Sequence, residues 1–178
     1  MRVTAVSAHN ARFQESFRRN LKAMVNLRSR DEQQTARLGA VLGPQLRSGD
    51  LVLLEGNLGA GKTSLARAII RGMAGAPIDV PSPTFGLIES YDFETPLYHV
   101  DLYRLDDADQ ALELGLEDMM DAGIMLIEWP ERVPWLSRGP RLEIRIEAKK
   151  DGTRMIRLTP HGGDWAARLT EIEAELCA

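Results

Sequence analysis

Apolar positions at helical spacing mark four stretches of this chain. Leu38, Val41 and Leu42 lie three or four residues apart, or side by side, which predicts a helix over residues 31–46. The same kind of pattern predicts three further helices, over residues 62–73, 107–123 and 164–176. Gly115 predicts a break within the helix over residues 107–123.

Short apolar runs lie between these helices and predict strands. They cover residues 51–55, 85–91, 96–105 and 123–129, the third ending in a polar cluster and the fourth stopped by Pro130. Apolar and charged residues alternate over 141–162 around Asp151-Gly152, which predicts a hairpin. Strands that alternate with helices and end in a hairpin predict one α/β domain with a mainly parallel sheet.

Length and composition fit this picture. The chain has 178 residues, enough for one domain with a sizeable core. Its single cysteine, Cys177, excludes a disulfide framework and a cysteine metal cluster, and it fits a reducing cytosol. No run of about 18 apolar residues occurs, so no transmembrane helix is expected. We therefore expect a cytoplasmic protein that does not enter the membrane.

Charge divides the chain into a basic start and an acidic remainder. Residues 1–30 hold seven Arg or Lys and one acid, a balance of +6, so the remainder carries −10 of the total of −4. An organelle transit peptide would also be Arg-rich and acid-poor, but we favour a basic, flexible extension over residues 1–28, followed by a folded domain over 29–178. The acidic domain disfavours direct binding of nucleic acid, which needs a basic face.

A glycine-rich motif joins the strand at 51–55 to the following helix. It reads Gly56-Asn57-Leu58-Gly59-Ala60-Gly61-Lys62-Thr63 and fits G-x-x-x-x-G-K-[ST] at every position. Glycines let backbone N–H groups turn inward around phosphates, and the helix aims its positive end at the same charge. Lys62 would reach the β- and γ-phosphates, and the Thr63 hydroxyl would ligate Mg²⁺. The motif predicts binding of a nucleoside triphosphate with magnesium.

Two acids that end apolar strands are candidates for the magnesium site. Asp101 ends the run LYHVD, and Glu128 ends the run IMLIE. Carboxylates in these places lie at the C-terminal edge of a parallel sheet, where ligands bind. At least one of them is expected to serve the metal, and the spacing leaves open which one.

The surroundings of these acids offer further candidates. The loop Pro81–Phe85 occupies the place where nucleotide switches sense the γ-phosphate, so Ser82 or Thr84 could contact metal or phosphate; a proline-rigid loop is the plain alternative. His99, two residues before Asp101, is expected to be a packed, hydrogen-bonded histidine near the site. Trp129 could belong to the core or line the site.

Motifs that the chain lacks narrow the choice of nucleobase and of reaction class. Neither N-K-x-D nor T-K-x-D occurs, so the guanine-reading motif of common GTPases is missing and adenine is expected. A small-molecule kinase should carry several arginines in a lid. The arginines that could form such a lid here are few, and prolines interrupt their segment; they are Arg132, Arg138 and Arg141.

The motifs together resemble the TsaE (YjeE) family, small bacterial ATPases needed for threonylcarbamoyladenosine modification of tRNA. GNLGAGKTS, SPTF, YHVDLYRL, ELGLEDMM and LIEWPERV occur in the family's order and spacing. The resemblance covers about residues 29–160, with Ser64 in place of a frequent second threonine. It implies a P-loop NTPase-like three-layer sandwich with a mainly parallel sheet and a C-terminal antiparallel hairpin.

The resemblance also implies roles for single residues. The amides of residues 57–64 and Lys62 would hold the phosphates of ATP, and Thr63 and Glu128 would ligate Mg²⁺. Asp101 would position the magnesium shell or the attacking water. Further nucleotide-binding positions implied by the resemblance are Thr84, Trp129, Glu32 and Arg154.

Partners follow from the same resemblance. TsaD and TsaB-type proteins would be the partners, and tRNA would be reached only through their complex. Because the motifs offer no obvious arginine finger or strong base, we expect slow hydrolysis alone and a site completed by partner docking. Two other classes stay open: a small-molecule or protein kinase, which would transfer phosphate to an added acceptor, and a nucleotide-gated adaptor without turnover.

Overall fold

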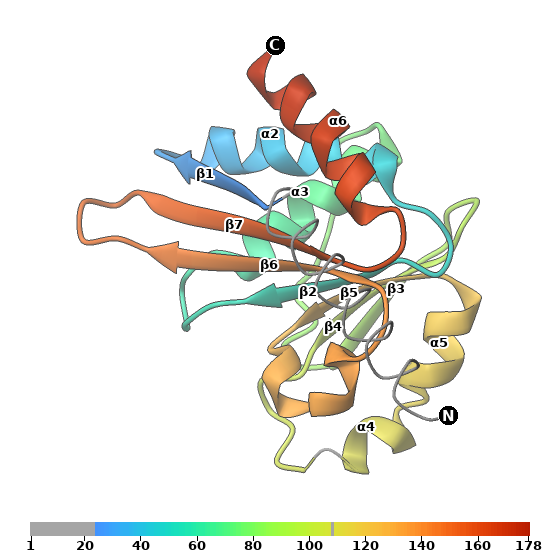
Figure 1. Cartoon of the computed structure of the whole chain (residues 1–178). Coiled ribbons are helices and arrows are strands. Elements are labelled where there is room, and N and C mark those ends of the chain that lie inside the picture. Colours follow the sequence, from blue (N-terminus) through green and yellow to red (C-terminus); the bar gives the residue numbers. More distant parts are fainter. Residues whose placement is uncertain (1–23, 108) are drawn as a thin grey trace, which may run out of the picture.

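The computed structural model describes residues 24–107 and 109–178, and within them seven strands form one sheet (Figure 1). The order of the strands across the sheet is β1-β7-β6-β2-β5-β4-β3. In chain order the strands are β1 (Val25–Ser29), β2 (Leu51–Glu55), β3 (Ile88–Tyr91), β4 (Leu97–Asp101), β5 (Ile124–Glu128), β6 (Arg141–Ala148) and β7 (Arg154–His161).

Parallel pairing is confined to the centre of the sheet. β6, β2, β5 and β4 pair in parallel, whereas β1 with β7, β7 with β6, and β3 with β4 pair antiparallel. Residues 149–153 join β6 to β7, and residues 92–96 join β3 to β4. Such short connections cannot make the crossover that a parallel pair requires. The predicted α/β class and C-terminal hairpin are confirmed. The expected parallel arrangement holds for the centre, and the sheet as a whole is mixed.

Helices cover both faces of the sheet. The alternation within β2 shows this directly, because Val52 and Leu54 join one buried core while Leu51 and Leu53 join the other. Such two-sided burial explains why β2 is a continuous apolar run. The first core lies under α2 (Glu32–Leu42), α3 (Lys62–Ala74) and α6 (Trp165–Cys177), and the second under α4 (Asp109–Glu113), α5 (Leu116–Ala122) and the 3₁₀ turns Pro130–Arg132 and Pro134–Ser137.

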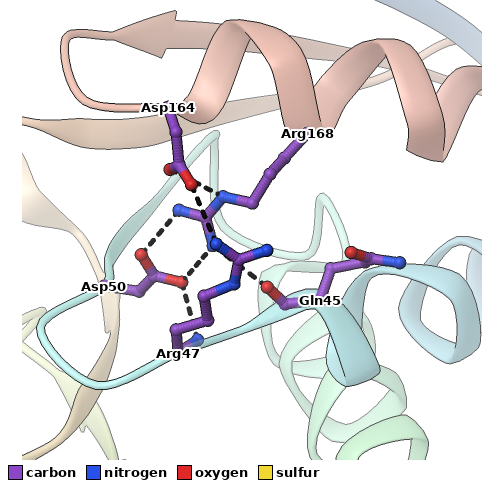
Figure 2. Close-up of polar contacts among 5 residues, drawn as sticks. All are labelled: Gln45, Arg47, Asp50, Asp164 and Arg168. Atoms are coloured by element: carbon purple, nitrogen blue, oxygen red, sulfur yellow. Dashed lines mark hydrogen bonds and ion pairs between the residues drawn. The ribbon is translucent and has the colours of Figure 1, made fainter.

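A buried ion pair connects α6 to the start of β2 (Figure 2). Arg168 is 4% exposed, and its Nη1 and Nη2 donate to the two carboxylate oxygens of Asp50 at 2.6 and 2.7 Å. Nη1 also donates to the backbone oxygen of Gln45 at 3.0 Å, and the guanidinium lies 3.7 Å from the ring centroid of Trp165. Because the two buried charges satisfy each other, α6 is fixed against the strand that leads into the glycine loop.

The structure corrects the expected start of the folded region. Val25–Ser29 form β1, so the sheet begins inside the segment 1–28 that the charge pattern predicts to be a flexible extension. The basic residues conceal a strand alternation, in which Val25 and Ser29 are buried while Arg28 Nη2 reaches Asp151 Oδ2 at 2.8 Å. The rest of that prediction concerns residues 1–23, which lie outside the described residues.

Three other elements differ clearly from the predictions, beginning with the strand expected over residues 96–105, because β4 ends at Asp101. β3 begins at Ile88 rather than Phe85, because the Leu87 amide donates to the Pro83 oxygen at 2.6 Å and closes a turn. Phe85 therefore lies outside the sheet and is 85% exposed. α2 ends at Leu42, and Pro44 lies in the separate 3₁₀ turn Gly43–Gln45 that follows it. The break predicted near Gly115 is present and separates α4 from α5. None of the helices in the described ranges has the length and apolarity needed to cross a bilayer.

Candidate functional site

The glycine motif forms a loop between β2 and α3, in the strand–loop–helix context that the sequence predicts. Gly56, Gly59 and Gly61 have φ values of 147°, 74° and 109°, which favour glycine over any other residue. A Cβ on Gly56 would lie 2.3 Å from the backbone oxygen of Ile146, so the loop also passes too close to β6 for a side chain. α3 begins at Lys62, and its free backbone N–H groups face the loop.

Lys62 lies folded against this loop. Its Nζ donates to the backbone oxygens of Gly56 at 2.6 Å and Asn57 at 3.1 Å, and it lies 3.7 Å from the ring centroid of Trp129. Burial lowers the pKa of the Lys62 ammonium, and the nearby carboxylates of the site, with Glu128 first among them, oppose this shift. The ammonium is therefore held beside the loop backbone in a site already rich in negative charge.

Trp129 is held in a strained conformation beside this ammonium. Its φ and ψ of 60° and 48° are left-handed, which is uncommon for a bulky residue. The ring contacts Lys62 on the loop side and lies 4.8 Å, centroid to centroid, from the ring of Tyr103. Of the two alternatives left open by the sequence, the structure shows Trp129 partly in the core and also lining the loop cavity.

Glu128 connects the loop to the edge of the sheet. Thr63 Oγ1 donates to Glu128 Oε2 at 2.9 Å, and Glu128 Oε1 lies 2.9 Å from His99 Nε2. His99 Nδ1 has no partner among the described residues, so we assign the ring proton to Nε2, which donates to the carboxylate. Glu128 and His99 are both buried. His99 is thus packed and hydrogen-bonded, as expected, and its pairing with Glu128 was not predicted from the spacing.

Asp101 holds the neighbouring loop. It lies beside Glu128 in register at the C-terminal edge of β4 and β5. Its Oδ2 accepts from Thr84 Oγ1 at 3.0 Å and its Oδ1 from the Tyr103 amide at 3.0 Å. Thr84 Oγ1 is also 2.8 Å from Ser82 Oγ. The segment 81–85 is therefore bound to one strand-end acid while Thr63 is bound to the other.

A cavity of about 310 Å³ brings most of the predicted site residues together. Its predicted members are Leu58, Gly59, Gly61, Lys62, Thr63, Ser64, Thr84, Asp101, Glu128, Trp129 and Arg154. Arg154, from β7, donates from Nε to the backbone oxygen of Ala60 at 3.2 Å. Tyr103 and Arg104 also line the cavity and were not predicted to do so. Their signal in the sequence is the run DLYR, which begins at Asp101.

Three predicted residues lie beside this cavity rather than in it. Asn57 and Ala60 line a neighbouring cavity of about 580 Å³, which also includes Leu58 and Trp129. Glu32, at the start of α2, lines two other cavities and shares Ser64 with both. Glu32 therefore lies near Ser64 but outside the cavity that Lys62 and Thr63 line.

The donor atoms of the site suit a magnesium ion that arrives with its substrate. Among the described residues no three His, Cys, Asp or Glu side chains form a metal-binding group. Mg²⁺ usually binds through one or two carboxylates together with substrate phosphates and water, rather than in an all-protein cage. The Thr63 hydroxyl and Glu128, with Asp101 beside them, provide such a partial oxygen set.

Comparison with known proteins gives consistent matches over most of the chain. The family model of threonylcarbamoyl adenosine biosynthesis protein TsaE matches residues 29–156. A tRNA threonylcarbamoyladenosine biosynthesis protein TsaE from Rickettsia conorii is 38% identical over 125 residues, 70% of this chain and 71% of the relative. The protein of the same name from Nostoc sp. is 38% identical over 136 residues, 73% of this chain and 82% of the relative.

A solved structure extends the similarity to the fold. The crystal structure of Bacillus subtilis YdiB matches with a TM-score of 0.73 and 28% sequence identity, covering 85% of this chain and 95% of the other. The match with the family model reaches from the last residue of β1 into β7 and includes the glycine loop and both strand-end acids. The chain therefore belongs to the TsaE family of tRNA threonylcarbamoyladenosine biosynthesis proteins.

Proposed function

We propose that this protein binds ATP with Mg²⁺ at the glycine loop and hydrolyses it in support of threonylcarbamoyladenosine modification of tRNA. The observation that supports this most strongly is the 2.9 Å hydrogen bond from Thr63 to Glu128. It joins the first turn after a phosphate-binding loop to an acid at the tip of the adjacent strand, as magnesium-dependent P-loop enzymes require. In this proposal the fold is a P-loop NTPase-like three-layer sandwich.

The phosphates would bind along the glycine loop. The backbone N–H groups of residues 57–64 and the N-terminus of α3 would donate to the β- and γ-phosphate oxygens. Lys62 Nζ donates to two neutral carbonyl oxygens, and a phosphate oxygen is a stronger, charged acceptor for it. Lys62 would therefore turn from the loop backbone to the phosphates and reduce its contact with Trp129.

Thr63 and Glu128 would hold Mg²⁺, which when bound neutralises charge on the β- and γ-phosphate oxygens. His99 would fix the orientation of Glu128 through its Nε2 proton. Asp101 would orient the attacking water and accept its proton, and Thr84, bonded to Asp101, would bring segment 81–85 toward the γ-phosphate.

The remaining residues concern the rest of the nucleotide. We propose adenine as the base because the guanine-reading motif is missing from the sequence. Arg154, held against Ala60, would add positive charge beside the phosphates, and Trp129 would form one wall of the site. Glu32 lines two cavities that adjoin Ser64, so it would lie at the edge of the nucleotide site.

Partners would complete the biological role. We propose TsaD and TsaB-type proteins as partners in the cytoplasm, with tRNA bound by their complex rather than by this chain. The charge of −10 outside residues 1–30 supports this division, because an acidic surface repels the phosphate backbone.

Phosphate release measured with and without TsaB and TsaD tests this function. The isolated protein should release phosphate from ATP slowly, and the partners should increase the rate. Phosphate transfer to an added acceptor instead of water would indicate a kinase. Tight ATP binding without phosphate release, even with both partners present, would indicate a nucleotide-gated adaptor.

A further inference from the structure

Arg104 is the cationic residue of the loop cavity that the function described so far leaves unused. It follows Asp101 by three residues and lines the same cavity of about 310 Å³ as Lys62 and Thr63. It comes from the segment after β4, whereas Lys62 comes from α3, so the two cations enter the cavity from different elements. Both cations are therefore available to a phosphate group bound in this cavity.

No carboxylate among residues 24–107 and 109–178 pairs with the guanidinium of Arg104. Within the described ranges its side chain makes neither an ion pair nor a hydrogen bond with another residue, and its one marked contact is with an aromatic ring. Its Cζ lies 4.6 Å from the ring centroid of Phe85. Arg154, the other arginine of the cavity, differs because its Nε donates to the loop backbone. Arg104 therefore keeps its hydrogen-bond donors available for a ligand.

Phe85 accounts for the position of this guanidinium. It is 85% exposed, in the turn that ends where the Leu87 amide donates to Pro83. A cation over an aromatic face is stabilised by the charge distribution of the ring. Thr84, the residue before Phe85, donates to Asp101, the acid to which we assign hydrolysis. The turn that contains Phe85 and contacts Arg104 is therefore attached to that acid.

We propose that Arg104 is a catalytic residue that donates hydrogen bonds to the γ-phosphoryl oxygens as ATP is hydrolysed, with Phe85 as its positioning residue. This inference rests on the proposed ATPase function. The water oxygen forms a bond to the γ-phosphorus while the bond from phosphorus to the β–γ bridging oxygen breaks, leaving its electron pair on ADP. Asp101 takes the water proton. Arg104 stays protonated throughout and stabilises the charge that builds up on the transferred group.

Binding of Mg-ADP with and without aluminium fluoride tests this role apart from turnover, because the fluoride complex imitates the transferred phosphoryl group. The wild-type protein, with TsaB and TsaD present, should bind Mg-ADP more tightly when aluminium fluoride is added. Arg104→Ala should keep the Mg-ADP affinity within about threefold and lose this gain. Its kcat should fall by about 10³-fold or more, with little change in KM.

Three further variants sharpen the test. Arg104→Lys should recover little, because an ammonium cannot bridge two oxygens as a guanidinium does. Phe85→Leu should lower kcat less than Arg104→Ala does and leave the Mg-ADP affinity unchanged. Arg138→Ala removes an arginine that does not line the cavity, so it should match the wild type in every measurement.

The outcomes separate this role from the function it depends on. An Arg104→Ala protein that kept both the fluoride gain and the wild-type kcat would overturn the role, because the arginine would then come from a partner or be unnecessary. An equal loss in Arg138→Ala would overturn it too, since any surface charge would then suffice. A wild-type protein that bound neither Mg-ADP nor ATP would instead refute the proposed ATPase function itself.

Discussion

The ammonium of Lys62 is the group whose replacement should change nucleotide binding most. It is buried and donates to two loop carbonyls. We expect Lys62→Ala to weaken binding of a fluorescent ATP analogue by at least about tenfold, because a hydrogen bond to a charged group contributes about 1.5–3 kcal/mol. Fluorescence titration measures this. Lys150→Ala, at the exposed hairpin turn, is the matched control, and equal losses in both variants would refute a specific contact.

Asp101 combines two tasks that substitutions can separate. Its carboxylate holds Thr84 and the Tyr103 amide, and we assign it the activation of water. Asp101→Asn keeps an acceptor oxygen but removes the charge. We expect it to bind ATP within about threefold of the wild type and to hydrolyse it about 10²–10⁴-fold more slowly, the usual contribution of a general base. Binding and phosphate release on the same preparation decide this.

Asp101→Ala provides the companion measurement. It removes the charge and the anchor of segment 81–85 together, so hydrolysis should be lost while ATP binding stays largely intact. If binding and hydrolysis fell equally in both variants, Asp101 would be an anchor for phosphate or metal rather than a residue that activates water.

Glu128 should control how the protein responds to magnesium. Its Oε2 accepts from Thr63, and it is the acid that the structure places nearest to the expected metal-binding hydroxyl. Glu128→Ala should raise the Mg²⁺ concentration needed for half-maximal ATP binding by about tenfold or more, because a charged ligand is lost. Magnesium titrations at fixed ATP measure this shift. An unaltered titration would transfer the role to Asp101.

Among the elements, α6 should contribute to stability through its buried ion pair. Arg168→Ala would leave the Asp50 carboxylate buried without its partner. We expect a loss of about 3–5 kcal/mol in the free energy of unfolding. Arg28→Ala is the control: its exposed side chain pairs with Asp151 at 2.8 Å, outside this network, and such pairs contribute about 0–1 kcal/mol. Urea unfolding followed by circular dichroism compares the two, and equal losses would contradict the assignment.

The central elements could be predicted because local pattern and burial agree there. β2 is buried on both faces, the glycine loop needs its positive φ values, and α3 has regular helical spacing, so residues 51–74 follow from the sequence. The hairpin of β6 and β7 follows equally from alternation around Gly152. In each case the residues that define the element are close together in the chain.

Elements that depend on distant contacts were predicted less well. β1 is recognisable only beside β7, because the basic residues around it conceal the alternation. Phe85 reads as the start of a strand, yet the bond from Leu87 to Pro83 turns it away from the sheet. Likewise the link from His99 to Glu128 joins two strands, and the place of Arg104 in the cavity depends on how the chain turns after β4. Spacing within one segment does not contain this information.

Across the molecule, the parallel centre of the sheet explains where the chemistry lies. β2 lies between β6 and β5, so the glycine loop at its end is next to Glu128 at the end of β5, with Asp101 one strand further. Both faces of this centre are covered by helices, which leaves the C-terminal edge for ligands. The acidic body fits our proposal that this protein uses ATP while other proteins hold the tRNA.

Calorimetric titration of the full chain with ATP in the presence of Mg²⁺, with TsaB and TsaD supplied in a parallel experiment, is the decisive measurement. One site per chain should saturate, and chelation of the metal should weaken the binding. A correctly folded protein that gave no heat of binding under either condition would show that the glycine loop does not hold a triphosphate.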